Sequence, residues 1–187
     1  MGMEVLSGGF ADPAPDAAFA FRGIMNAMAR PGRIETIVGA EGPAPLSRAA
    51  ATVLMTLCDP DTALYLAPSC DSLAVREWIG FHTGAPVGPT SAAHFAVGRW
   101  HELQPLERFR TGTLEYPDRS ATLIAEMDVL ASEGATLRGP GIEIEARLSL
   151  PDLDAFQRNH GQFPLGLDFI FTAGDRIAAL PRSTQVS

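Results

Sequence analysis

The run LDFIFT at residues 167–172 decides the fold class. It is apolar except for Asp168, and such a run is typical of a central strand that is buried on both faces. The turn signal Ala173-Gly174-Asp175 follows and leads into a second apolar strand over residues 177–180. A carboxylate inside a buried strand is costly unless it is paired or hydrogen-bonded. Asp168 therefore indicates either a structural partner, such as an arginine or backbone amides, or a role that faces a ligand or an interface.

Three helices are predicted upstream of this strand. The first begins near the capping residues and prolines of positions 12–16, and its predicted inward residues are Phe21, Ile24, Met25 and Met28, at helical spacing. The second covers residues 46–58. The third runs from Asp71 to Thr83 and is predicted to bury Val75, Trp78, Ile79 and His82. Proline and glycine at positions 31 and 32 end the first helix, since neither continues one.

Strands cluster in the second half of the chain. Alternating apolar and polar residues predict strands over residues 123–129 and 142–148, joined through a turn at 139–141. Shorter strands are expected at 33–38, 63–67 and 94–98, and short helices at 102–109 and 151–160. We find no internal repeat or linker. The pattern predicts one α/β or α+β domain over residues 1–187, with a mixed sheet and helices packed on it.

Composition excludes several classes of function. Of the 187 residues, 46% are hydrophobic and 19% charged, which is typical of a globular chain. The net charge is −8, from 22 acidic and 14 basic residues, so the chain lacks the basic surplus that nucleic-acid binding needs. No apolar stretch approaches the roughly 18–20 residues that cross a bilayer, and residues 1–10 do not resemble a signal peptide. We expect a cytoplasmic protein that binds neither nucleic acid nor membrane.

All fourteen basic residues are arginine, and the chain has no lysine. It therefore cannot form the internal aldimine of a pyridoxal phosphate enzyme, the Schiff base of an aldolase, or a P-loop of the usual kind. Cys58 and Cys70 lack the spacing of a zinc or iron–sulfur site, and Cys58 is typical of a buried structural thiol. His94 and His101 have no ligand partners at metal spacing. No metal or organic cofactor is expected.

A few polar residues are candidates for a ligand site or an interface. His82 is either a core histidine or a pocket acid, base or phosphate-binding group. Arg182, with Ser183 and Thr184, suits oxyanions or belongs to a solvated tail. The Thr111-Gly112-Thr113 loop either cradles phosphate or simply caps and turns. The candidate set comprises His82, Thr83, Thr111, Thr113, Asp118, Asp168, Arg182 and Thr184.

No motif among the residues names a reaction. Neither the nucleophile elbow GxSxG nor the dinucleotide fingerprint GxGxxG is present. The glycines of residues 139–141 precede a strand pattern, so they lack the helix dipole of a phosphate loop and indicate a plain turn.

Several ordered stretches nevertheless resemble one family. They include FADP at 10–13, AMARPG at 27–32, FHT at 81–83, TGT at 111–113, FPLGLD at 163–168 and LPRST at 180–184. In this order they resemble the PhnH family, whose members are subunits of the bacterial carbon–phosphorus lyase system of phosphonate metabolism. The chain departs from the family pattern at Asp118, where glutamate is expected, and at Ser183, where threonine is expected. Neither departure changes the chemical class of the side chain.

The resemblance implies a fold related to pyridoxal phosphate-dependent transferases, without the cofactor. It implies a homodimer that also joins a core assembly with other subunits. That assembly displaces adenine from ATP and attaches a phosphonate to C1 of the ribose, giving a ribose 1-phosphonate 5-triphosphate. A later radical step on an iron–sulfur subunit breaks the carbon–phosphorus bond, and two cysteines cannot ligate such a cluster.

Two roles for the chain follow from the resemblance. In the first, the chain is an assembly subunit with little chemistry of its own. In the second, it is a ligand-binding or catalytic homodimer, with Thr111, His82, Asp168 and Arg182 around a phosphonate or an ATP-derived group.

Overall fold

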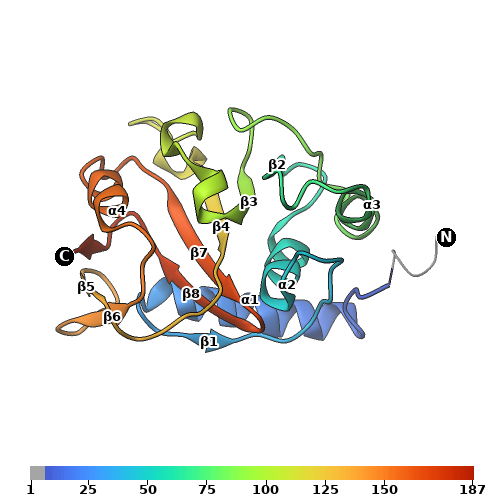
Figure 1. The fold of residues 1–187 in the computed structure, drawn as a ribbon, viewed down its shortest axis with the longest axis horizontal. Coiled ribbons are helices and arrows are strands. Elements are labelled where there is room, and N and C mark those ends of the chain that lie inside the picture. Colours follow the sequence, from blue (N-terminus) through green and yellow to red (C-terminus); the bar gives the residue numbers. More distant parts are fainter. Residues whose placement is uncertain (1–6) are drawn as a thin grey trace.

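A six-stranded mixed sheet organises the computed structural model, which describes residues 7–187 (Figure 1). The first six residues of the segment considered for a signal peptide lie outside the described residues. The strand order is β1-β8-β7-β4-β3-β2, with bounds Glu35–Thr36, Arg176–Leu180, Asp168–Ala173, Thr122–Glu126, Phe95–Arg99 and Leu64–Leu66. Strands β2, β3, β4 and β7 are parallel, while β8 and β1 are antiparallel to their neighbours. The predicted α/β class with a mixed sheet is confirmed.

Strand β7 is the central strand that the LDFIFT run predicts. It pairs with β4 in the register Thr122↔Asp168 and with β8 on its other side. Phe169 and Phe171 are fully buried on one face of the sheet, and Ile170 is buried on the other. Because both faces are covered, a continuous apolar run is the stable choice for this position.

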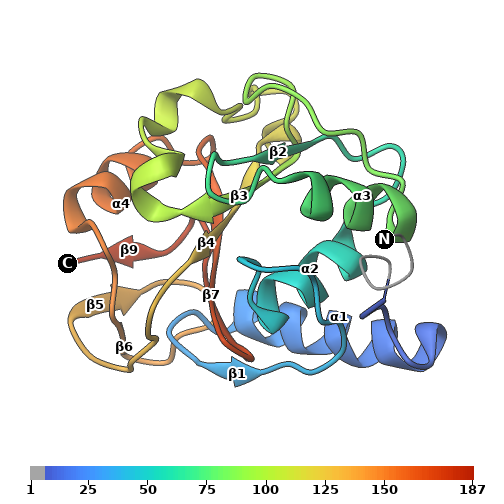
Figure 2. The ribbon, with the colours of Figure 1, turned by 45° about the vertical axis from the view of Figure 1, so that its right-hand side comes forward.

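Helices α1 (Pro13–Ala29), α2 (Arg48–Leu57) and α3 (Leu73–His82) build the core on the Ile170 face (Figure 2). Serine hydroxyls cap two of them: Ser47 accepts from the Ala50 amide at 3.1 Å and Ser72 from the Val75 amide at 3.2 Å. The second and third predicted helices are therefore confirmed, with slightly shorter bounds.

The predicted inward face of α1 is wrong in part. Ala20, Ile24 and Ala27 are buried, whereas Phe21 and Met25 are each 51% exposed. The two alanines let α1 approach its neighbours closely beside Ile24, while Phe21 and Met25 point away from the core. Counting large apolar residues at helical spacing misplaces part of the face when small residues form much of the contact.

Helix α4 (Leu153–His160) and the first two of three short 3-10 helices cover the Phe169 face. The 3-10 helices are η1 (Trp100–Leu103), η2 (Leu106–Arg108) and η3 (Pro117–Arg119). The short helix expected over 102–109 is present as two separate 3-10 turns, η1 and η2. Pro105 separates η1 from η2, because a proline inside a helix removes a hydrogen bond and clashes with the preceding turn.

A second, three-stranded sheet has the order β6-β5-β9, with bounds Ala146–Leu148, Ala135–Arg138 and Gln185–Val186 (Figure 2). The predicted strand over 142–148 is confirmed only from residue 146, and Ile144 is 79% exposed. Gly141, at φ +82°, completes a turn beside the Ala29 carbonyl at the end of α1, and a bend at residues 143–144 follows before β6 begins. The strand predicted over 123–129 ends at Glu126.

Within residues 7–187, no helix combines the length and apolarity that crossing a membrane requires.

Candidate functional site

An ion pair between Asp168 and Arg182 joins the first residue of β7 to the segment after β8. The Asp168 Oδ1 atom accepts from the Arg182 backbone amide at 2.8 Å and from its Nε at 3.1 Å. The Oδ2 atom accepts from Nη2. The two side chains are only 18% and 13% exposed. Asp168 therefore has the kind of structural partner that its position in a buried strand indicates, a backbone amide and an arginine together.

Arg182 also holds the loop that precedes β4. Its Nη1 donates to the Pro117 carbonyl at 2.6 Å, and its Nη2 donates to the Ser120 hydroxyl. Ser120 forms an isolated β-bridge with Thr111, whose carbonyl accepts from the Gly166 amide at 3.0 Å. The fold thus brings three predicted residues, Thr111, Asp168 and Arg182, into one region.

Thr113, Asp118 and Thr184 lie near this region but do not point to a shared centre. The Thr113 hydroxyl accepts from the Tyr116 amide at 3.1 Å and so closes a turn. Asp118 is exposed on η3. Thr184 is 2% exposed, and its hydroxyl oxygen has no hydrogen-bond partner among the described residues.

His82 and Thr83 belong to a different part of the molecule, the end of α3. That helix follows β2, which β3 and β4 separate from β7 in the sheet. The His82 ring is half-buried and packs against Trp78, with ring centroids 5.0 Å apart. Thr83 caps the helix: its hydroxyl donates to the Ile79 carbonyl at 2.8 Å and accepts from the Ala85 amide at 3.1 Å. The candidate set is therefore divided between two regions.

An open apolar groove of about 540 Å³ adjoins the ion pair. Its apolar lining comes from Met25, Met28, Ala29, Pro140, Phe163 and Pro181, and Gly141, Asp168, Arg182 and Ser183 complete it. We call it the α1 groove. Phe163 is 58% exposed, and Phe21, one turn before Met25 on α1, is 51% exposed. Sequence reasoning missed this surface because it placed Phe21 and Met25 in the core.

A mostly buried carboxyl group, Glu126, lies at the opposite, carboxyl edge of the parallel strands. It accepts from the Ser47 amide at 2.7 Å and from the Thr172 hydroxyl at 2.9 Å, and so ties β4 and β7 to the start of α2. Burial raises the pKa of Glu126, although these hydrogen bonds and Arg99 oppose the shift. A pocket of about 150 Å³ adjoins it. The alternating pattern of residues 123–129 predicts a strand there but carries no signal that Glu126 is buried.

Both cysteines are buried thiols. Burial raises the pKa of Cys58 to about 12 and that of Cys70 to about 11. The His94 Nδ1 atom accepts from the Ala63 amide at 3.0 Å, and burial together with Arg110 lowers its pKa. In the part of the chain that the structure describes, no three side chains of the ligating types gather as a metal site would need.

Comparison with known proteins extends the resemblance to nearly the whole chain. The sequence profile of the PhnH family, described as "Bacterial phosphonate metabolism protein (PhnH)", matches residues 8–187. The chain belongs to the PhnH family. A family relative, "Alpha-D-ribose 1-methylphosphonate 5-triphosphate synthase subunit PhnH" of Rhizobium meliloti (strain 1021), is 40% identical over 98% of this chain and 96% of its own length. A second relative, "Putative C-P lyase subunit protein HtxG" of Stutzerimonas stutzeri, is 34% identical over 93% of this chain and 87% of its own. PhnH membership, which the ordered stretches predicted, is confirmed.

Proposed function

We propose that this chain is a subunit of a bacterial carbon–phosphorus lyase complex in phosphonate catabolism. In that complex it supports the formation of a ribose 1-phosphonate 5-triphosphate from ATP and an alkylphosphonate, with displacement of adenine. Family membership over nearly the whole chain supports the pathway, since two relatives carry the names of subunits of such systems. Its own role is assembly, with most bond-making residues on other subunits.

The hydrogen bonds that the candidate polar residues make within the chain support an assembly role. Asp168 and Arg182 bond to each other, and Arg182 also binds a carbonyl and a hydroxyl of the neighbouring loop. Thr83 and Thr113 close a helix end and a turn. These groups therefore already serve the fold, and this arrangement is unlike a set of donors aimed at a triphosphate.

The α1 groove is the surface that we assign to assembly, and it is the observation that carries the proposal. Large apolar side chains that gather on a surface mark protein–protein contacts. Met25 and Phe163 are each more than half exposed, and they flank a groove whose floor is fixed by the Asp168–Arg182 pair. A partner that covers the groove would remove both from water.

The proposal includes a homodimer and contacts with other subunits of the complex, in the cytoplasm and without nucleic acid. It also includes one domain over residues 1–187, a fold related to pyridoxal phosphate-dependent transferases, and no cofactor. The net charge of −8 supports the absence of nucleic acid because it disfavours binding of polyanions, and the absence of lysine supports the absence of pyridoxal phosphate because no aldimine can form.

The test is co-purification of the other subunits with a tagged chain from its own host. Met25→Asp and Phe163→Asp place a charge in the α1 groove, and Leu73→Asp is the matched control because Leu73 is 72% exposed at the start of α3. We expect the groove variants to recover at least tenfold less of the other subunits, with an unchanged melting temperature, and the control to behave as wild type. Wild-type recovery with both groove variants would contradict the proposed surface.

The alternative is a ligand-binding or catalytic homodimer, and one observation favours it: a polar cavity on the other face of the sheet. Under this alternative, ATP or an alkylphosphonate raises the melting temperature of the isolated chain, since a ligand stabilises the state it binds. No shift at millimolar ligand contradicts the alternative and leaves the assembly role in place.

A further inference from the structure

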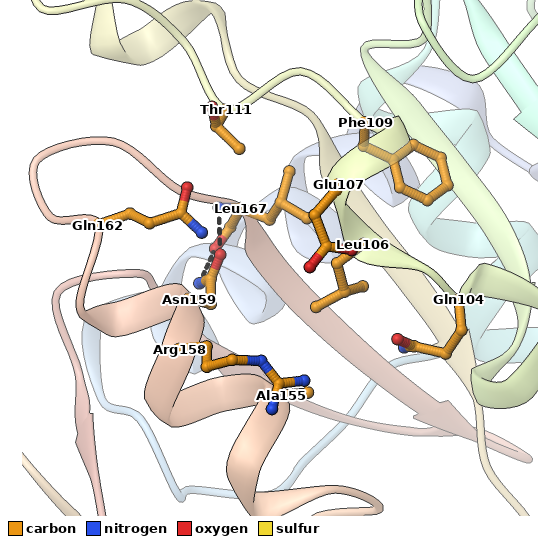
Figure 3. A pocket seen from close by; sticks show the side chains of 10 residues that line it. All are labelled: Gln104, Leu106, Glu107, Phe109, Thr111, Ala155, Arg158, Asn159, Gln162 and Leu167. Atoms are coloured by element: carbon orange, nitrogen blue, oxygen red, sulfur yellow. Dashed lines mark hydrogen bonds between the residues drawn. The ribbon is translucent and has the colours of Figure 1, made fainter.

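A cavity of about 200 Å³ lies between α4 and the segment from η1 to Thr111 (Figure 3). Leu106, Phe109 and Leu167 give it apolar walls, while α4 contributes Arg158 and Asn159. We call it the α4 cavity. It is separate from the α1 groove, with which it shares no lining residue.

Two opposite charges line the α4 cavity without forming an ion pair. Arg158 enters from α4 and Glu107 from η2, and both side chains are exposed. Among the described residues, neither has a partner within ion-pair distance, so they do not neutralise each other. Figure 3 shows them on different walls of the cavity. A ligand between them would meet a positive group and a negative group at once.

A buried donor in the cavity has no acceptor. The Gln104 Nε2 atom is buried, and it finds no hydrogen-bond partner among the described residues. Figure 3 shows this amide group pointing from its wall toward the interior, where Arg158 also points. A buried donor without a partner costs free energy, so its position here indicates an acceptor that a ligand would bring.

The wall beside Arg158 is held rigidly. The Asn159 amide donates to the Leu167 carbonyl at 2.9 Å and accepts from the Leu167 amide at 2.8 Å, and Asn159 is 5% exposed. This pair of hydrogen bonds fixes α4 against the start of β7. Arg158, the preceding residue on α4, is thus presented from a fixed backbone, as a binding group requires.

We propose that the α4 cavity binds a small zwitterion. Its oxyanion contacts the Arg158 guanidinium and the Gln104 amide, and its ammonium group contacts the Glu107 carboxylate. A simple anion would be repelled by Glu107, and a simple cation by Arg158. At about 30 Å³ for each water of liquid volume, the cavity has room for roughly six or seven water-sized groups, which fits a small amino acid or an aminoalkylphosphonate. This binding proposal does not rest on the assembly role proposed above.

Calorimetric titration of the isolated chain tests this site. The zwitterionic probes are β-alanine and 2-aminoethylphosphonate, and the singly charged probes are propionate, ethylphosphonate and ethylamine. We expect saturable binding of at least one zwitterion and at least tenfold weaker binding of every singly charged probe. A preference for 2-aminoethylphosphonate identifies a phosphonate ligand, and a preference for β-alanine identifies a carboxylate ligand.

Variants connect the binding to the cavity. Arg158→Gln and Glu107→Gln should each weaken the zwitterion at least tenfold, while Arg147→Gln, which removes an exposed charge from β6, should not. Arg158→Gln should also remove most of the preference for a zwitterion over ethylamine, a change that a general loss of structure would not produce. Equal binding of ethylphosphonate and 2-aminoethylphosphonate, or no binding of any probe at millimolar concentration, would overturn the proposal. The co-purification experiment does not depend on either outcome.

Discussion

Two pairs of opposite charges lie on either side of the start of β7, and they differ in one respect. Asp168 and Arg182 are in contact, and both are mostly buried. Arg158 and Glu107 line one cavity, are exposed, and do not meet. The first pair has used its hydrogen-bonding capacity to hold β7, β8 and the 111–120 loop together. The second pair keeps its hydrogen-bonding groups available for the proposed ligand. Whether the two charges touch therefore distinguishes the structural site from the proposed ligand site.

The largest effect on stability should come from breaking the ion pair between Asp168 and Arg182. Asp168→Ala leaves the Arg182 guanidinium mostly buried without its carboxylate, and we expect the free energy of unfolding to fall by about 3 kcal/mol, in the range for a broken buried pair. Urea denaturation measures it. Asp168→Asn keeps an acceptor for the Arg182 backbone amide and should cost less. A loss below about 1 kcal/mol for Asp168→Ala would mean that this pair is worth no more than a surface pair.

Substitution by alanine should affect stability differently at Asn159 and at Arg158, two neighbouring residues of α4. Asn159→Ala leaves the buried Leu167 amide and carbonyl without partners, and we expect it to lower the free energy of unfolding by about 2 kcal/mol. Arg158→Ala removes an exposed side chain that forms no ion pair within residues 7–187, and its stability should stay within about 0.5 kcal/mol of wild type. Chemical denaturation of both variants measures the difference. A large loss of stability with Arg158→Ala would contradict the view that its charge is free for a ligand.

Local patterns in the sequence predicted much of the fold. The LDFIFT run identified the central strand, and apolar residues at helical spacing identified α2 and α3. The prediction failed where distant contacts decide the structure. Ile144 follows a strand pattern, yet it is exposed in a bend after the turn that places Gly141 beside the end of α1. Phe21 follows a core pattern, yet small residues of α1 make the contact.

The site was predicted only in part, for the same physical reason. A carboxylate in a buried strand requires a partner, so Asp168 could be singled out from the sequence. That the partner is Arg182, and that Arg182 also binds Ser120, depends on the pairing of β7 with β8 and on the path of a distant loop. Arg158 and Glu107 each look like ordinary surface residues. Only the fold places them on one cavity.

Glu126 should make the stability of the protein depend on pH. Its pKa is raised above the ordinary value of 4.5, so between pH 4.5 and the raised pKa the folded protein retains a proton that the unfolded chain releases. This group's contribution to stability therefore decreases as the pH rises through that window. Glu126→Gln cannot ionise, and its free energy of unfolding relative to wild type should increase from below pH 4.5 to pH 7. Denaturation at several pH values measures it, and a pH-independent difference would contradict the assignment.

The smallest expected effect concerns the two cysteine thiols, which should react slowly with a thiol reagent in the folded protein. Because burial raises the pKa of Cys58 to about 12 and of Cys70 to about 11, almost no thiolate is present in the folded protein near pH 8. An aromatic disulfide reagent should therefore react slowly with the native chain and quickly after unfolding in guanidinium. Rapid reaction of either thiol in the native protein would show that it is accessible and activated.

The most direct test of the assembly role is the native mass of the tagged protein, purified from its own cells grown on a phosphonate as the phosphorus source. The account predicts that it elutes in a large assembly of fixed stoichiometry with other subunits of the carbon–phosphorus lyase system. Elution of the wild-type chain only as a free homodimer under these conditions would contradict the assembly role.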